Sequence, residues 1–108
     1  MDFETEVLKA SEVQPVLVDF WAPWCEPCLM LEPILTDLEA ENKGEWALVK
    51  INIDEETEIA NSSRIMSVPT IKVFKNQEII ATYNGLMWKP EMKKWIDNTL
   101  NGTGEQIE

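Results

Sequence analysis

Cys25 and Cys28 are the only cysteines in this chain of 108 residues, and two residues separate them. A Cys-x-x-Cys pair can form half of a zinc or iron–sulfur site, act as a reversible dithiol, or pack as two unreactive thiols. A structural zinc site needs four ligands, and the chain has no histidine and no second cysteine pair. The spacing therefore favours thiol–disulfide chemistry with no metal and no other cofactor, and it leaves two packed thiols as an alternative.

The cysteine pair lies between a predicted strand and a predicted helix. Residues 16–20 form an apolar run broken only by Asp19, which is typical of a strand buried on both faces. Apolar residues then recur at helical spacing over residues 28–40, and Pro33 is expected to kink this helix. Cys25 would therefore lie near a helix N-terminus, where free backbone amides and the helix dipole favour a thiolate.

The rest of the chain predicts an alternation of helices and strands. We expect helices over residues 3–10 and 54–61, strands over residues 46–53, 70–74 and 78–83, and a last helix that begins near Pro90. The last two strands are close enough to form an antiparallel hairpin, and the earlier two flank a helix, which implies a right-handed crossover. The expected fold class is α/β, a mixed central sheet with helices on both faces. We expect one domain over residues 1–102 and a frayed tail over residues 103–108.

Charge and hydropathy exclude several classes of partner. The chain has 20 acidic and 9 basic side chains and a formal net charge of −11, which repels the phosphates of nucleic acids. No run approaches the roughly 18 apolar residues that span a bilayer, so we expect no membrane association. The first residues lack the basic and apolar regions of a secretory signal, and this favours a cytoplasmic protein.

Residues 18–28, with the sequence Val-Asp-Phe-Trp-Ala-Pro-Trp-Cys-Glu-Pro-Cys, closely resemble the active-site segment of thioredoxins. Further matches follow in the order and approximate spacing of that family, at residues 50–54, 67–70 and 74–76 and at Gly85. The resemblance covers roughly residues 3–100. It implies a thioredoxin fold and a thiol–disulfide oxidoreductase that reduces disulfides in target proteins. Its electron donor would be a thioredoxin reductase-type enzyme.

The resemblance also implies a role for each matching residue in the dithiol chemistry. Cys25 would be the exposed attacking thiolate, and Cys28 would resolve the mixed disulfide. Asp19 would accept the proton of the buried cysteine, with Lys50 close by. A carboxylate in an apolar strand is costly unless it is paired or protonated, so Asp19 needs such a reason. The alternative is that its carboxylate merely reaches water at the end of the strand.

A second group of residues is implied in substrate binding. The proline that matches Pro69 is cis in thioredoxins, although an X-Pro bond taken by itself is expected to be trans. The backbone of Val68 would then pair with an extended substrate strand. Trp24, Gly85 and Leu86 would surround a shallow apolar surface at this point.

The sequence departs from the family beside the cysteines and at the N-terminus. Glu26 replaces the usual glycine, and Leu29 a frequent lysine, so both changes make the site more negative. Glu26 is expected to disfavour the Cys25 thiolate modestly and to make the couple more reducing than in a Glu26→Gly variant. Pro27 stiffens the turn between the sulfurs and is expected to tune the potential as well.

The usual N-terminal strand is missing, so we expect a sheet of about four strands with residues 46–53 at an edge. A dimer through this edge is a hypothesis, and a monomer is the expected state.

Two other functions are compatible with the same fold. One is an oxidase or isomerase in an oxidising compartment, and the other is a non-catalytic adaptor. An adaptor needs neither the cysteine pair nor Asp19 and Pro69, so their presence together favours the reductase.

Overall fold

The computed structural model describes residues 1–102, and the predicted frayed tail at residues 103–108 lies outside this range. The described elements alternate between helical segments and strands. In chain order they are η1 (Glu4–Lys9, a π-helical segment), η2 (Ala10–Glu12, a 3-10 turn), β1 (Val16–Trp21), α1 (Glu26–Glu41), β2 (Ala47–Asn52), α2 (Thr57–Ser62), β3 (Thr70–Lys75), β4 (Glu78–Asn84) and α3 (Lys89–Asn101).

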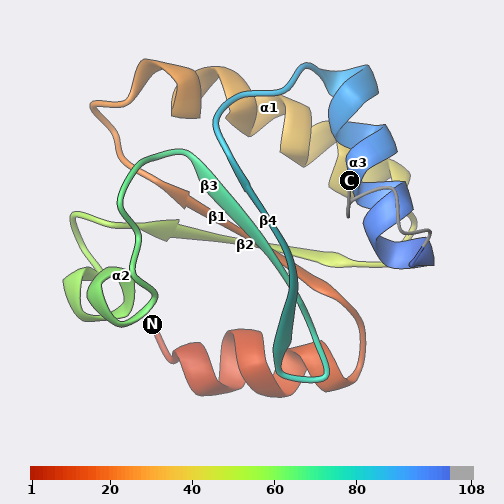
Figure 1. Cartoon of the computed structure of the whole chain (residues 1–108), viewed down its shortest axis with the longest axis horizontal. Helices are drawn as coiled ribbons and strands as arrows, with labels where there is room; N and C mark the ends of the chain where they lie inside the picture. Colours follow the sequence, from red (N-terminus) through yellow and green to blue (C-terminus); the bar gives the residue numbers. More distant parts are fainter. Residues whose placement is uncertain (103–108) are drawn as a thin grey trace.

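The four strands form one mixed sheet in the order β2-β1-β3-β4 (Figure 1). β1 pairs in parallel with β2 and antiparallel with β3, and β3 pairs antiparallel with β4. The expected α/β class and mixed four-stranded sheet are thus confirmed. β2 is an edge strand, as expected for residues 46–53.

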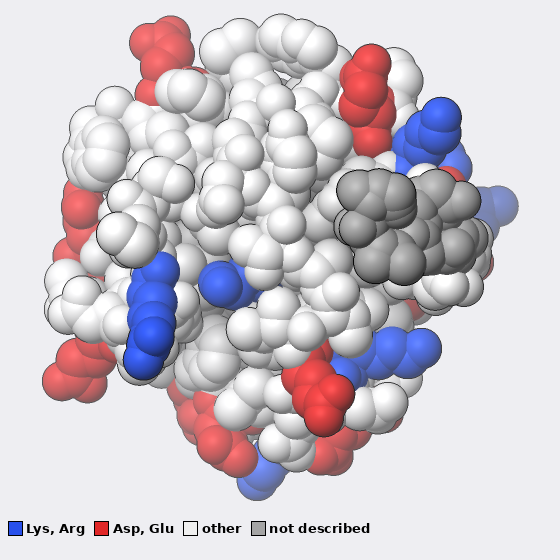
Figure 2. All heavy atoms as spheres, in the orientation of Figure 1, with Lys and Arg blue, Asp and Glu red and all other residues white. Residues whose placement is uncertain are grey.

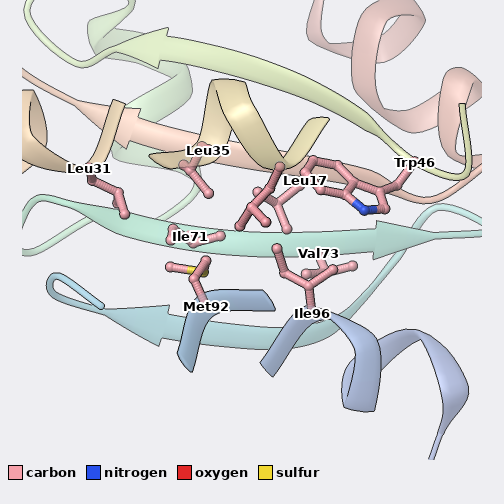
Figure 3. Packing of buried hydrophobic residues seen from close by; sticks show 9 residues of the cluster. Leu17, Leu31, Leu35, Trp46, Ile71, Val73, Met92 and Ile96 are labelled. Carbon is pink, nitrogen blue, oxygen red and sulfur yellow. The ribbon is translucent and has the colours of Figure 1, made fainter. Parts of the chain in front are cut away.

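Helices cover both faces of the sheet, and each face has its own apolar core. α1 and α3 pack on one face, where buried side chains of two strands and both helices meet (Figure 3). This cluster includes Leu17, Leu31, Leu35, Ile71, Val73, Met92 and Ile96. The other face is covered by the N-terminal segment and by residues of α2, and its buried side chains are Val7, Val16, Val18, Phe20, Ile51 and Phe74.

The turn of the β3–β4 hairpin is held by the N-terminal segment. Asn76 and Gln77 have φ angles of 52° and 70°, the left-handed pair that a two-residue type I′ turn requires. The backbone N–H of Asn76 donates to the carbonyl oxygen of Ser11, and that of Gln77 donates to the Ser11 hydroxyl, each at 2.8 Å. These two bonds favour the turn although Gln77 stands where glycine is common.

Element boundaries differ from the predicted ones at two places. The predicted helix over residues 54–61 begins only at Thr57, because Asn52 first forms a turn. Its side-chain oxygen accepts from the N–H of Asp54 at 2.8 Å, and its carbonyl oxygen accepts from the N–H of Glu56 at 2.9 Å. The first helical segment extends beyond residue 10 to Glu12 before Pro15 follows.

α1 continues through Pro33 to Glu41. Its side chains also protect the free edge of β2, because the backbone N–H of Leu48 donates to a carboxylate oxygen of Glu39 at 2.9 Å. Leu48 therefore does not offer this N–H to another strand.

Candidate active site

The two cysteines form a disulfide at the start of α1, with their Cα atoms 5.2 Å apart. Cys25 is the N-cap of the helix and has an extended backbone, so its side chain lies over the first turn. Its Sγ accepts a hydrogen bond from the backbone N–H of Cys28 at 3.2 Å. Amides at a helix N-terminus have no partner within the helix, and a thiolate at Cys25 would be stabilised by the same N–H.

Both cysteines are shielded in this disulfide state. Cys25 is 5% exposed and Cys28 is 2% exposed. The expected exposed Cys25 is therefore not found in the oxidised protein. The sulfurs pack with Ala22 and with the partly buried Trp21 and Val68, and these neighbours cover them.

The segment before β3 contacts the disulfide, and the segment after β4 contacts that segment in turn. Cys25 Sγ lies 3.6 Å from the carbonyl oxygen of Val68, in the segment before β3. The Val68–Pro69 peptide bond is cis, as the family resemblance implies. The carbonyl oxygen of Pro69 in turn accepts from the backbone N–H of Gly85 at 2.9 Å. Gly85 has a φ of 113°, a conformation open to glycine, so this close approach depends on that residue.

Apolar side chains are exposed near this junction. Trp24 is 68% exposed, and its indole N–H donates to a carboxylate oxygen of Asp54 at 3.0 Å. Leu86 is half-buried and packs against the core that lies under α1 and α3. Met66, two residues before Val68, is 94% exposed. Figure 2 shows that uncharged side chains fill much of the face turned to the viewer and that most acidic side chains in view lie toward its rim.

Asp19 is a buried carboxylic acid beneath α1. It is 1% exposed, and its Oδ1 has no hydrogen-bond partner among residues 1–102. The alternative of a carboxylate that reaches water at the strand end is therefore wrong. The pKa of Asp19 is raised to about 7, chiefly by burial; the charge of Lys50 opposes this rise, and the nearby Glu32 carboxylate adds to it. A carboxyl group with such a pKa can take up or release a proton near neutral pH.

Lys50 lies directly opposite Asp19 in the β1–β2 register, but its ammonium is bound elsewhere. Nζ lies 2.7 Å from a carboxylate oxygen of Glu32 and 3.5 Å from the hydroxyl oxygen of Thr36, both on α1. The family resemblance implied that Lys50 lies close to Asp19, and the two are opposite each other in the register; Glu32 was not among the expected residues. Its position four residues after Cys28, one helical turn along α1, is the signal that could have found it.

Comparison with known proteins agrees with this geometry. The family model for thioredoxin matches residues 1–98 of the chain. The chain belongs to the thioredoxin family. It is 45% identical over 98 residues to "Thioredoxin" of Rickettsia bellii and to that of Rickettsia felis, covering 91% of either sequence in each pair. It is 39% identical over 100 residues to "Thioredoxin" of Buchnera aphidicola, covering 93% of this chain and 91% of that protein.

Family membership and the disulfide together make the chain a thiol–disulfide oxidoreductase with protein-disulfide reductase activity, and its mixed sheet is that of the thioredoxin fold. Within residues 1–102 there is no group of three or more histidine, cysteine or acidic side chains that could hold a metal ion. Nor is any helix in that range long and apolar enough to cross a bilayer.

The two residues between the cysteines of this thioredoxin-family protein occupy the first turn of α1. Glu26 is exposed and begins the helix, and Pro27 follows it. A proline is tolerated there because its missing N–H would have no partner in the helix. The Glu26 carboxylate interacts favourably with the helix dipole but adds negative charge beside Cys25.

Proposed function

We propose that the chain reduces disulfides in target proteins and is then reduced again by a thioredoxin reductase-type donor. The observation that carries this proposal is the disulfide itself, placed at a helix N-terminus and beside the Val68 carbonyl. In this role Cys25 and Cys28 carry two electrons from the donor to the target, and no other cofactor takes part.

The reaction begins with the reduced protein. The Cys25 thiolate attacks one sulfur of the target disulfide, so that a new S–S bond joins Cys25 to the target and the first target thiolate leaves and takes up a proton. Asp19 accepts the proton of the Cys28 thiol, and the Cys28 thiolate attacks Cys25 Sγ. The second target thiolate leaves, and the protein disulfide re-forms. The target gains two electrons, and the dithiol loses two.

Substrate binding is assigned to the backbone and side chains around the sulfurs. Val68 and Pro69 would pair with an extended target segment through the backbone of Val68. Trp24, Gly85 and Leu86 would provide the surrounding apolar surface. The exposure of Trp24 and the short distance from Val68 to Cys25 support this assignment.

The setting of the reaction is also a proposal. A reductase of this kind works in a reducing compartment, and we place it in the cytoplasm. We further propose that it acts as a monomer on protein substrates and does not bind nucleic acid or membranes. The net charge of −11 supports the last point.

Reduction of insulin by dithiothreitol tests the activity. The wild-type chain should accelerate it, and Cys25→Ser should abolish the acceleration because no attacking thiolate is left. Cys28→Ser should instead accumulate mixed disulfides with targets, because resolution fails. An adaptor without catalysis would give no acceleration even in the wild type.

The reduction potential separates the reductase from an oxidase or isomerase. A value near that of thioredoxin, about −270 mV, supports a reductase, whereas one near −120 mV would support an oxidase. Equilibration with glutathione of known ratio provides this measurement.

A further inference from the structure

Two carboxyl groups, those of Asp19 and Glu32, lie near Lys50, and its ammonium binds only that of Glu32. Lys50 lies opposite Asp19 in the parallel register of β1 and β2. Its Nζ nevertheless forms an ion pair of 2.7 Å with Glu32 and lies 3.5 Å from Thr36 Oγ1. Asp19 Oδ1 meanwhile has no hydrogen-bond partner in the described part of the chain.

The difference in exposure explains this choice of partner. The side chains of Lys50 and Glu32 are 32% and 55% exposed, so their pair keeps much of its hydration. Asp19 is 1% exposed, and an ion pair with it would remove the ammonium from water. Such desolvation opposes the gain from a buried pair, whereas the hydrated pair avoids most of that cost.

We propose that Glu32 is a positioning residue, which holds the Lys50 ammonium at the surface of α1 and so away from the buried Asp19 carboxyl. This inference rests on the proposed role of Asp19 as proton acceptor for Cys28. Glu32 on α1 would thereby join Asp19 and Lys50 in the proton transfer, because it influences the pH at which Asp19 can accept a proton.

Lys50 and Glu32 are the charged groups that act on Asp19 among the described residues, and its other neighbours are uncharged. The electrostatic influences on the Asp19 pKa are burial first, then the opposing charge of Lys50 from β2, then Glu32 from α1. On β3 the opposite residue is the apolar Ile71. The buried side chains of α3 carry no charge, since Met92 and Ile96 are apolar and Thr99 has a neutral hydroxyl. Cys28 titrates only after reduction.

The test is the titration of Asp19 by carboxyl NMR in the oxidised full chain, which requires no substrate. In Glu32→Gln the ammonium is released toward Asp19, and an opposite charge nearby favours the ionised carboxyl. We expect the midpoint of the Asp19 titration to fall by about one pH unit. The matched control is Asp37→Asn, an exposed residue of the same helix with the same change in charge, and it should leave the midpoint within about 0.2 unit. An unchanged midpoint in Glu32→Gln would overturn the proposal.

A double-mutant comparison separates positioning from direct repulsion. In a Lys50→Met background, Glu32→Gln can act on Asp19 only through its own charge. We expect the shift there to be less than about half of that in the presence of Lys50. Equal shifts in both backgrounds would show that Glu32 acts by repulsion alone and would contradict the positioning role.

Activity provides the second readout. If the Asp19 midpoint falls in Glu32→Gln, the acid limb of the pH profile for insulin reduction should move by the same amount, with little change in the plateau. A shifted midpoint with no insulin reduction by the wild type would leave Glu32 as the positioning residue and reject the proposed function. A shifted midpoint with an unmoved pH profile in an active enzyme would reject the link between Glu32 and catalysis.

Discussion

The indole N–H of Trp24 donates a 3.0 Å hydrogen bond to a carboxylate oxygen of Asp54, which connects the residue before Cys25 to the segment that follows β2. Because Trp24 is 68% exposed, few packing contacts fix its ring. The bond holds the edge of the ring and leaves much of its surface open to a bound target.

Loss of this bond should weaken target binding without loss of fold. In Asp54→Ala the Trp24 ring becomes free to rotate, and a hydrogen bond at the surface contributes about 0.5–1.5 kcal/mol. We expect KM for a protein disulfide to rise about two- to tenfold, with kcat and the midpoint of unfolding nearly unchanged. Glu55→Ala, at an exposed neighbouring residue, is the charge-matched control. The same increase in KM for both variants would attribute it to charge and not to the Trp24 contact.

Asp19 predicts a distinct pH dependence of stability. Burial raises its pKa from 3.8 to about 7 in the folded protein, so the folded state binds this proton more tightly than the unfolded state. The free energy of unfolding should therefore fall by at most about 4 kcal/mol as the pH rises from about 4 to about 7. Above about pH 7 the contribution of Asp19 should be constant. In Asp19→Ala this fall is absent.

The Asp19→Ala variant should accordingly be more stable than the wild type at pH 8, by about 2 to 4 kcal/mol less the cost of a small cavity, and gain nothing at pH 4. Urea unfolding at both pH values measures the difference. The variant should also reduce insulin more slowly near neutral pH. A pH profile of the rate that is identical to the wild type would remove Asp19 from the proton transfer.

Glu26 predicts a small change in redox potential. Its carboxylate is exposed, and a unit charge at about 6 Å in water changes the energy of the Cys25 thiolate by roughly 0.7 kcal/mol. In Glu26→Gln the thiolate and hence the reduced form are stabilised, so the potential should become less negative by about 15 mV. Glu58→Gln on α2 is the control for net charge. A more negative potential in Glu26→Gln would contradict this role.

The edge of β2 predicts a change in self-association. The wild-type chain should be monomeric by light scattering, since Glu39 occupies the N–H of Leu48. Glu39→Ala leaves this N–H without its acceptor and should lower the free energy of unfolding by about 1 kcal/mol. Its mean mass should also rise with concentration, because the edge can now pair. Glu39→Gln retains an acceptor oxygen and should be monomeric, so dimers of this variant would exclude the edge as their cause.

The sequence predicted the sheet well because strand and helix signals agreed along the chain. The apolar run at residues 16–20 could be recognised as a central strand since both its faces are covered. The predicted helix over residues 54–61 began too early because Asp54 and Glu55 are suited to the first turn of a helix. The structure shows that the N–H groups of Asp54 and Glu56 instead donate to Asn52, which forms a turn before the helix. Local preferences cannot reveal such a competing side-chain contact.

Site residues that belong to a short motif could be identified from the sequence. Contacts between residues far apart in the sequence could not. The two cysteines and Asp19 could be identified from a short segment of the chain. The helical spacing from Cys28 could have placed Glu32 near the site, but its ion pair with Lys50 also depends on how far its side chain reaches across from α1. The low exposure of Cys25 likewise depends on Val68, which lies 43 residues further along the chain.

That separation has a consequence during synthesis on the ribosome. β1 is made first, yet it occupies an inner position between β2 and β3. A nascent chain therefore carries both cysteines as uncovered thiols until the segment that contains Val68 has emerged, and it completes the sheet only with the last strands. In that interval the pair has no cover from the α2–β3 segment, so both thiols are more accessible to other thiols and oxidants than in the folded protein.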